Sequence, residues 1–135
     1  MGDKEIKVHI RADSRYPIDR KRIRKLVRDF LREMGVEGEM QVGVVMVGDR
    51  KMKELNMKYL KVEGTTDVLS FSQTETSEKV SEFIEPTDNG LYLGEVIVSW
   101  PQAMKQALER QITVDEEVDF LVKHGLLHLM RIHHD

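Results

Sequence analysis

The chain has 135 residues, contains no cysteine and carries a formal net charge of −3 at pH 7. This length suits one domain over residues 1–135, large enough to bury a core without disulfides. Without cysteine there is no thiolate metal site, so any metal must be held by imidazole, carboxylate or water. No apolar run approaches the ~18 residues that span a bilayer, and residues 1–10 lack a signal-peptide core, so we expect a cytoplasmic protein.

Positive charge is concentrated near the start of the chain. Residues 11–34 hold nine Arg or Lys and four Asp or Glu, an excess of +5, which leaves −8 for the remaining residues. Such asymmetry fits a basic face for an anionic partner. The alternative is the solvated side of an amphipathic helix. The residues that would form such a face are Arg20, Lys21, Arg22, Arg24, Lys25 and Arg28.

The first half of the chain predicts two strands and two helices. Residues 5–10, EIKVHI, alternate apolar and polar side chains with the period of a half-buried strand. Residues 18–35 repeat apolar residues at helical spacing, and Asp19 is placed to cap this helix. The apolar run at 40–48 suits a strand covered on both faces. A second helix at 49–62 would bury Met52, Leu55, Tyr59 and Leu60.

Two more strands follow. Residues 65–71, TTDVLSF, indicate a strand, and the acidic stretch 73–90 indicates an exposed loop. Residues 91–100, LYLGEVIVSW, indicate a fourth strand, in which Gly94 suggests a bulge or a close backbone approach. At its end we expect Trp100 to pack at the corner rather than to stack on a base.

Two helices complete the chain. Pro101 sits well in the first turn of a helix at 101–111. Thr113 and Glu116 form a capping box before the last helix. The element order predicts an α+β fold, a single domain with a small mixed four-stranded sheet packed by helices. Helical crossovers favour parallel pairing, and the loop between the third and fourth strands allows an antiparallel return.

Four of the five histidines lie in the final stretch HGLLHLMRIHHD. His124 and His128 are one helical turn apart, so their Cβ atoms share a face at about 6 Å. Two imidazoles at this spacing can bind one cation at ~2.0–2.1 Å per bond. A third ligand six residues later must come from a chain that has left the helix and folded back. His134 fits that spacing, with His133 and Asp135 as alternatives.

Three histidines leave one coordination position for water, as in catalytic sites. The metal would lower the pKa of that water toward ~7. Zinc peptidases of the H-E-x-x-H type carry a glutamate base after the first histidine, where this chain has Gly125, so a peptidase would lack its base. Glu117 lies roughly 10 Å from His124 by helical rise, too far for a direct role. The histidines are alternatively ordinary surface or core residues.

Three separated blocks resemble the YbeY family, metal-dependent endoribonucleases associated with ribosomal RNA maturation. They are LNMKYLKVEGTTDVLSF at 55–71, LGEVIVS at 93–99 and HGLLHL at 124–129. The family pattern runs from L-N-x-x-Y-R to T-D-V-L-S-F-P, then L-G-D-I-x-I-S, then H-G-x-L-H-L-x-G-Y-D-H. Order and intervals match, and the resemblance covers at least residues 40–134.

The resemblance implies a single-strand-specific endoribonuclease that processes rRNA, at the 3′ end of 16S rRNA and in ribosome quality control, through metal-activated water. Its partners would be RNA and ribosomal particles. It also implies one metal ion, usually zinc, on His124, His128 and His134, with His124 and His128 catalytic through the bound water. Residues 66–71 would border the cleft. Asp67 and Glu95 would lie near it, or be a turn cap and a solvent-facing strand residue.

Two departures from the family pattern matter. The family arginine, regarded as catalytic or phosphate-binding, is Leu60 here, and leucine cannot donate to phosphate. Lys58, Lys61 or the basic residues of the first helix would have to serve as RNA-binding groups. The family's terminal glycine, which turns the chain out of the helix, is Arg131, at a steric cost of roughly 1 kcal/mol in a left-handed turn. Leu60 favours the alternative function, a non-enzymatic, metal-stabilised RNA-binding factor for ribosome assembly.

Overall fold

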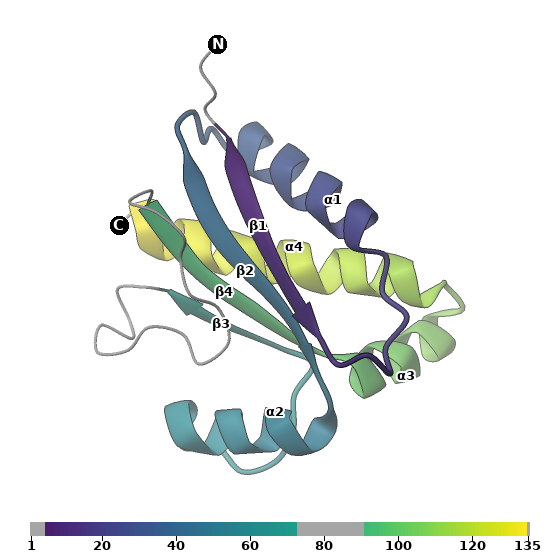
Figure 1. Ribbon diagram of the computed structural model, residues 1–135. Helices are drawn as coiled ribbons and strands as arrows, with labels where there is room; N and C mark the ends of the chain where they lie inside the picture. The colour runs from purple at the N-terminus through teal and green to yellow at the C-terminus, as the bar shows by residue number, and fades with distance from the viewer. Residues whose placement is uncertain (1–4, 73–90, 135) are drawn as a thin grey trace.

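Four strands form one mixed sheet in the order β1-β2-β4-β3 (Figure 1). The computed structural model describes residues 5–72 and 91–134, with side chains up to residue 131, so the predicted loop at 73–90 lies outside the described residues. β2 pairs in parallel with β1 and β4, and β3 pairs antiparallel with β4, which confirms the predicted mixed sheet. The strands are β1 (Ile6–Ala12), β2 (Met40–Val47), β3 (Val68–Ser72) and β4 (Leu91–Ser99).

Helices pack on both faces of this sheet. α1 (Arg20–Glu33) and α4 (Val114–His134) pack on one face, and Figure 1 shows them lying along it. α2 (Asp49–Leu55) and the π-helix η1 (Asn56–Leu60) pack on the other. α3 (Trp100–Arg110) follows β4 and packs against α4. None of the helices within the described ranges is long and apolar enough to cross a membrane.

Strand β2 is buried along its whole length, as its apolar run predicts. Its side chains alternate between the two faces because successive residues of a strand point to opposite sides. Val42 and Val44 join the core under α1 and α4, whereas Val45 and Val47 pack with Met52 of α2. An apolar core therefore lies on each face of the sheet, and both cores include residues of β4.

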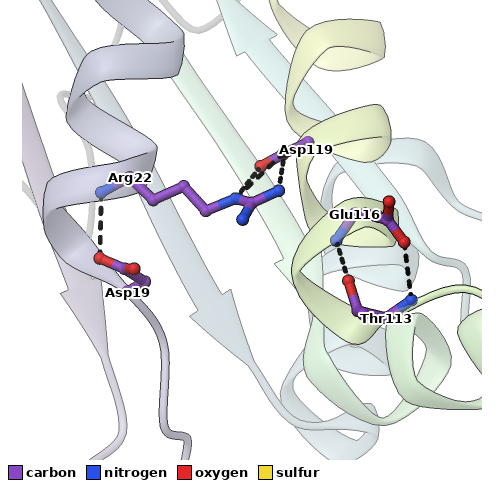
Figure 2. A network of polar contacts seen from close by, with 5 residues as sticks. All are labelled: Asp19, Arg22, Thr113, Glu116 and Asp119. Atoms are coloured by element: carbon purple, nitrogen blue, oxygen red, sulfur yellow. Dashed lines mark hydrogen bonds and ion pairs between the residues drawn. The ribbon is translucent and has the colours of Figure 1, made fainter.

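The predicted helix starts are confirmed (Figure 2). Asp19 accepts a hydrogen bond from the Arg22 N–H at 3.0 Å and caps α1. Thr113 and Glu116 exchange two bonds, of 2.9 and 3.1 Å, before α4. The Arg22 guanidinium also reaches Asp119 of α4 at 2.7 Å, which ties the two helices together.

The helix predicted at 49–62 differs from the structure, because it changes to a π-turn at Asn56. Asn56 is buried, and its Nδ2 donates to the Gly64 carbonyl at 3.0 Å, which pulls the following loop against the helix. The π-turn inserts one residue into the helix and so rotates the side chains after it by about 100°. Leu60, predicted to be buried, is 50% exposed at the last position of η1.

Strand β4 contains the bulge that Gly94 predicted. Gly94 has φ +140°, and a Cβ there would lie 2.3 Å from the Phe71 carbonyl oxygen. Beside it, Glu95 is buried and accepts a hydrogen bond from the Tyr92 hydroxyl at 2.9 Å. The solvent-facing alternative for Glu95 is therefore wrong, because β4 is an interior strand covered on both faces. Trp100 is buried and stacks on Tyr16, as the packing prediction requires.

Candidate active site

A cavity of about 760 Å³ lies where α4, η1 and the segment containing β3 meet. Both His124 and His128 line it, and both are exposed on α4. Residues 66–71 form the opposite wall, as the resemblance implied, although the strand itself begins at Val68. The full lining is Tyr59, Leu60, Thr66, Asp67, Val68, Leu69, Ser70, Phe71, His124 and His128.

Gly125 explains why α4 lies so close to this wall. A Cβ at Gly125 would stand 2.6 and 2.9 Å from the two Cγ atoms of Val96 and 3.1 Å from Ser70 Oγ. That hydroxyl donates to the Gly125 carbonyl at 3.1 Å, which joins α4 directly to β3. The glycine thus allows the close approach that puts His124 and His128 beside the strand.

The same contact argues against peptidase chemistry. In the H-E-x-x-H pattern the residue after the first histidine must face the substrate as a base. Here that position faces Val96 inside the core. A carboxylate at residue 125 would have no room beside Val96, so this position cannot supply the glutamate base of a peptidase.

The η1 side of the cavity is aromatic and apolar. Tyr59 and Phe71 pack as a tilted pair with ring centroids 4.9 Å apart, and Leu60 stands half exposed beside them. Lys58 and Lys61 are exposed on the same segment without lining the cavity, and the Lys58 Nζ lies 5.1 Å from the Tyr59 centroid. Residue 60, where the family has its arginine, therefore does line the cavity, but this chain has a leucine there.

A polar network holds the opposite wall, and sequence reasoning missed its centre, Asp49. Its carboxylate accepts from Ser99 Oγ at 2.9 Å, from Thr65 Oγ1 at 3.3 Å and from Gln102 Nε2 at 3.3 Å. These donors come from the end of β4, from the segment before β3 and from α3. Asp49 therefore fixes the chain just before Asp67, which lines the cavity.

Two acceptor atoms on α3 and α4, one in Gln106 and one in Glu117, are buried without a hydrogen-bond partner. Gln106 donates its Nε2 to Asp67 Oδ2 at 3.1 Å, while its Oε1 is buried without a partner. Glu117 is 0% exposed and accepts from Arg110 at 3.2 Å, while its Oε2 is also unpartnered. An unmet buried acceptor costs about 1–3 kcal/mol. The sequence did carry a signal for Gln106, because it is a polar residue at helical spacing from the buried Ala103.

Most of the basic residues of α1 contact other groups of the protein. Arg20 and Arg28 donate to the Ile10 and Ile6 carbonyls of β1, each at 3.0 Å. Those carbonyls are four residues apart and so point to the same side of β1, an outer strand of the described sheet. These two arginines therefore cover a sheet edge.

Two further cations of α1 are paired with carboxylates. Hydrogen bonding to Asp119 raises the pKa of Arg22, and hydrogen bonding to Asp29 raises the pKa of Lys25. Both groups are consequently held in the charged form. Lys21 and Arg24 line a shallow groove of about 550 Å³ along the same helix.

The structure does not bring α1 and the histidines together. Arg22 meets α4 at Asp119, and His128 follows nine residues later, which is about 180° around the helix axis at 3.6 residues per turn. α1 packs against β1, at the opposite edge of the sheet from β3. The basic groove and the cavity are therefore separate surfaces on either side of α4.

The expected third ligand lies outside the described side chains. His133 and His134 have a described helical backbone only, and Asp135 is not described. Because α4 continues to His134, the predicted departure from the helix after His128 is not found. Arg131 is helical and avoids the left-handed turn that a glycine would adopt. Among the described side chains no three metal-binding groups converge, so the described residues contain two neighbouring histidines and no complete metal site.

Comparisons with known proteins agree on one family. The family model described as Endoribonuclease YbeY matches residues 8–135. An endoribonuclease YbeY of Dehalococcoides mccartyi is 33% identical over 96% of this chain and 78% of its own length. One from Roseiflexus sp. is 34% identical over 100% of this chain and 84% of its own. A Thermotoga maritima protein solved in solution has a similar fold, with TM-score 0.58 and 22% identity over 90% of this chain and 71% of its own.

Proposed function

The chain belongs to the endoribonuclease YbeY family, and from this premise we propose that it cleaves single-stranded RNA in the processing and maturation of ribosomal RNA. We assign that role to the 3′ end of 16S rRNA and to ribosome quality control in the cytoplasm. The observation that carries the proposal is the pair of exposed histidines, His124 and His128, one turn apart in an open cavity.

In this proposal His124, His128 and His134 hold one zinc ion. A bound zinc ion supplies an acidified water and a polarising charge for a phosphodiester. The chain's own contribution is to hold the first two imidazoles on the rigid helix α4, which Gly125 anchors to β3. For His134 to join them the last turn of α4 must unwind, and His133 and Asp135 compete for the same place.

The RNA would contact two surfaces. Lys58 lies on η1 and Lys61 follows it, on the aromatic side of the cavity, and they would neutralise phosphate there in place of the family arginine. The groove of α1 would hold a flanking part of the strand, with Lys21 and Arg24 as its main cations. Phosphate contacts of this kind give affinity without sequence selection.

The test is a metal analysis joined to a cleavage assay on end-labelled single-stranded RNA. We expect one zinc per chain, cleavage that stops with chelator, and recovery when zinc is restored. His128→Ala should lower cleavage at least 100-fold and leave RNA affinity within about twofold, since its imidazole is far from the α1 groove. Lys123→Ala, an exposed change on the same helix, is the control. Cleavage that survives complete metal removal would refute hydrolysis by this site.

A second function is favoured by Leu60. With a leucine at the cavity mouth, the protein could bind RNA as a ribosome-assembly factor in which the metal only stabilises α4. Stoichiometric zinc and tight RNA binding without cleavage would establish this function. Leu60→Arg separates the two, because a gain of cleavage in that variant would show that only the missing cation had limited the reaction.

A further inference from the structure

The described residues that form the cavity wall away from the histidines include no cation that could bind a phosphate. Among the described residues that line it there is no Lys or Arg, and Asp67 adds a carboxylate. Tyr59, Leu60 and Phe71 supply an apolar wall beside that carboxylate. Such a wall suits a flat, largely apolar ring that carries hydrogen-bond donors on one edge.

Asp67 is held as an oriented acceptor. Gln106 Nε2 donates to Oδ2 at 3.1 Å, and Thr66 Oγ1 lies 3.4 Å from Oδ1. The Asp67 carbonyl accepts from the Ser99 N–H at 2.9 Å, which fixes the backbone. A carboxylate has about four lone-pair sites, so each oxygen keeps one lone pair beyond these two contacts, on a residue that lines the cavity.

The orientation of Gln106 that supports Asp67 costs the protein some stability. Gln106 directs its amide N–H₂ at the carboxylate and leaves its own Oε1 buried and unpartnered. If the Gln106 amide were reversed, its oxygen would face the Asp67 carboxylate and the hydrogen bond to Asp67 would be lost. Buried unsatisfied groups in native structures call for an explanation. Presenting the remaining lone pairs of Asp67 to the cavity provides one.

We propose that this wall selects an unstacked guanine base, with the N1–H and N2–H₂ groups donating to the two oxygens of Asp67 and the ring lying against Leu60 and the Tyr59–Phe71 pair. This inference rests on the proposed function, in which the cavity takes single-stranded RNA. Proteins read unpaired bases by such edge contacts combined with packing on aromatic and apolar side chains. Cleavage would then fall next to guanosines.

The other bases match a carboxylate less well. Guanine alone presents two N–H donors side by side on its Watson–Crick edge. Adenine and cytosine present one amino group beside an acceptor nitrogen, and uracil presents one N–H between two carbonyl oxygens. Each of these acceptors would face a carboxylate oxygen and be repelled. A bidentate pair is typically worth a tenfold or larger preference over a wrong base.

The first test uses uncharged nucleosides, so that the basic groove of α1 plays no part. Binding of guanosine, adenosine, cytidine and uridine to the zinc-loaded full chain would be measured by titration NMR. We expect guanosine to bind at least tenfold more tightly than the others. Asp67→Asn should abolish that preference, and Gln106→Met should reduce it. Glu109→Gln, which removes an exposed carboxylate of α3, should leave it unchanged.

The second test maps cleavage in RNAs that contain one guanosine at varied positions. Equal affinity for the four nucleosides, or cuts that ignore the guanosine, would overturn the inference while RNA cleavage itself still stood. Guanosine selectivity in a protein that cleaves no RNA would support the binding site and refute only the nuclease proposal. Because the nucleoside series is decisive with the unmodified chain, misfolding of a variant cannot hide the answer.

Discussion

Gly125→Ala tests whether α4 lies as close to the sheet as the cavity requires. In an exposed helix this change is stabilising by about 1 kcal/mol, because alanine has the better helix propensity. Here the added Cβ would stand 2.6 and 2.9 Å from the Val96 methyl carbons, where ordinary contacts are about 3.5–4.0 Å. The helix or Val96 must therefore move by roughly 1 Å.

Overpacking of this kind costs about 1–3 kcal/mol. The movement also stretches the 3.1 Å bond from Ser70 to the Gly125 carbonyl, worth about 1 kcal/mol. After the gain in helix propensity is subtracted, we expect a net loss of about 1–3 kcal/mol in the free energy of unfolding. His124 and His128 would move with the helix, so zinc affinity should fall together with stability.

The assay is urea unfolding of Gly125→Ala, Val96→Ala and the double variant. Val96→Ala removes the colliding methyl groups, so the double variant should be more stable than the sum of the single effects predicts, by at least 0.5 kcal/mol. Lys123→Ala serves as the control for substitution on this helix. If Gly125→Ala is stabilising by about 1 kcal/mol, the close approach is absent and the geometry of the cavity is wrong.

Three further predictions concern α1 and the end of α4. Arg131→Gly should raise zinc affinity about fivefold by calorimetry, because glycine lowers the cost of unwinding the last turn by about 1 kcal/mol and accepts a left-handed conformation; unchanged affinity would mean that His134 is not a ligand. Arg28→Ala should lower the free energy of unfolding by about 1 kcal/mol, because its bond to β1 is lost. Lys21→Ala should leave stability unchanged and reduce the salt dependence of RNA binding by about one unit of slope. The reverse pattern would contradict the assignment of Arg28 to the edge of β1. A double-mutant cycle of Arg22 and Asp119 should give a coupling of about 0.5–1 kcal/mol that weakens with salt, and no coupling would show that α1 and α4 are held by apolar contacts alone.

Local sequence patterns predicted the strands, the helix starts and the pair of histidines because these depend on residues close together in the chain. The alternation at β1, the capping box of Thr113 and Glu116 and the one-turn spacing of His124 and His128 all follow from short-range geometry. The π-turn did not follow, because it depends on the bond from Asn56 to a carbonyl eight residues ahead. Nothing in the periodicity of 49–62 marks that contact.

The candidate site was only partly predictable for the same reason. The sequence pointed to His124 and His128, but the role of Gly125 depends on Val96 and Ser70, which lie on strands far away in the chain. Gln106 was readable as a polar residue on an apolar stripe. Its target, Asp67, could not be known until α3 and β3 were placed in space.

The basic segment shows the limit of reasoning from local charge. An excess of +5 over residues 11–34 gives the field that an RNA strand meets, but the affinity gained from each cation depends on what that cation already contacts. Arg20, Arg22 and Arg28 already donate to protein acceptors, so fewer of their N–H groups remain for a phosphate and the net gain is smaller. RNA affinity should therefore depend more on Lys21 and Arg24 than the charge count suggests. Since their groove lies across α4 from the histidines, a bound strand must pass around that helix to reach the cavity.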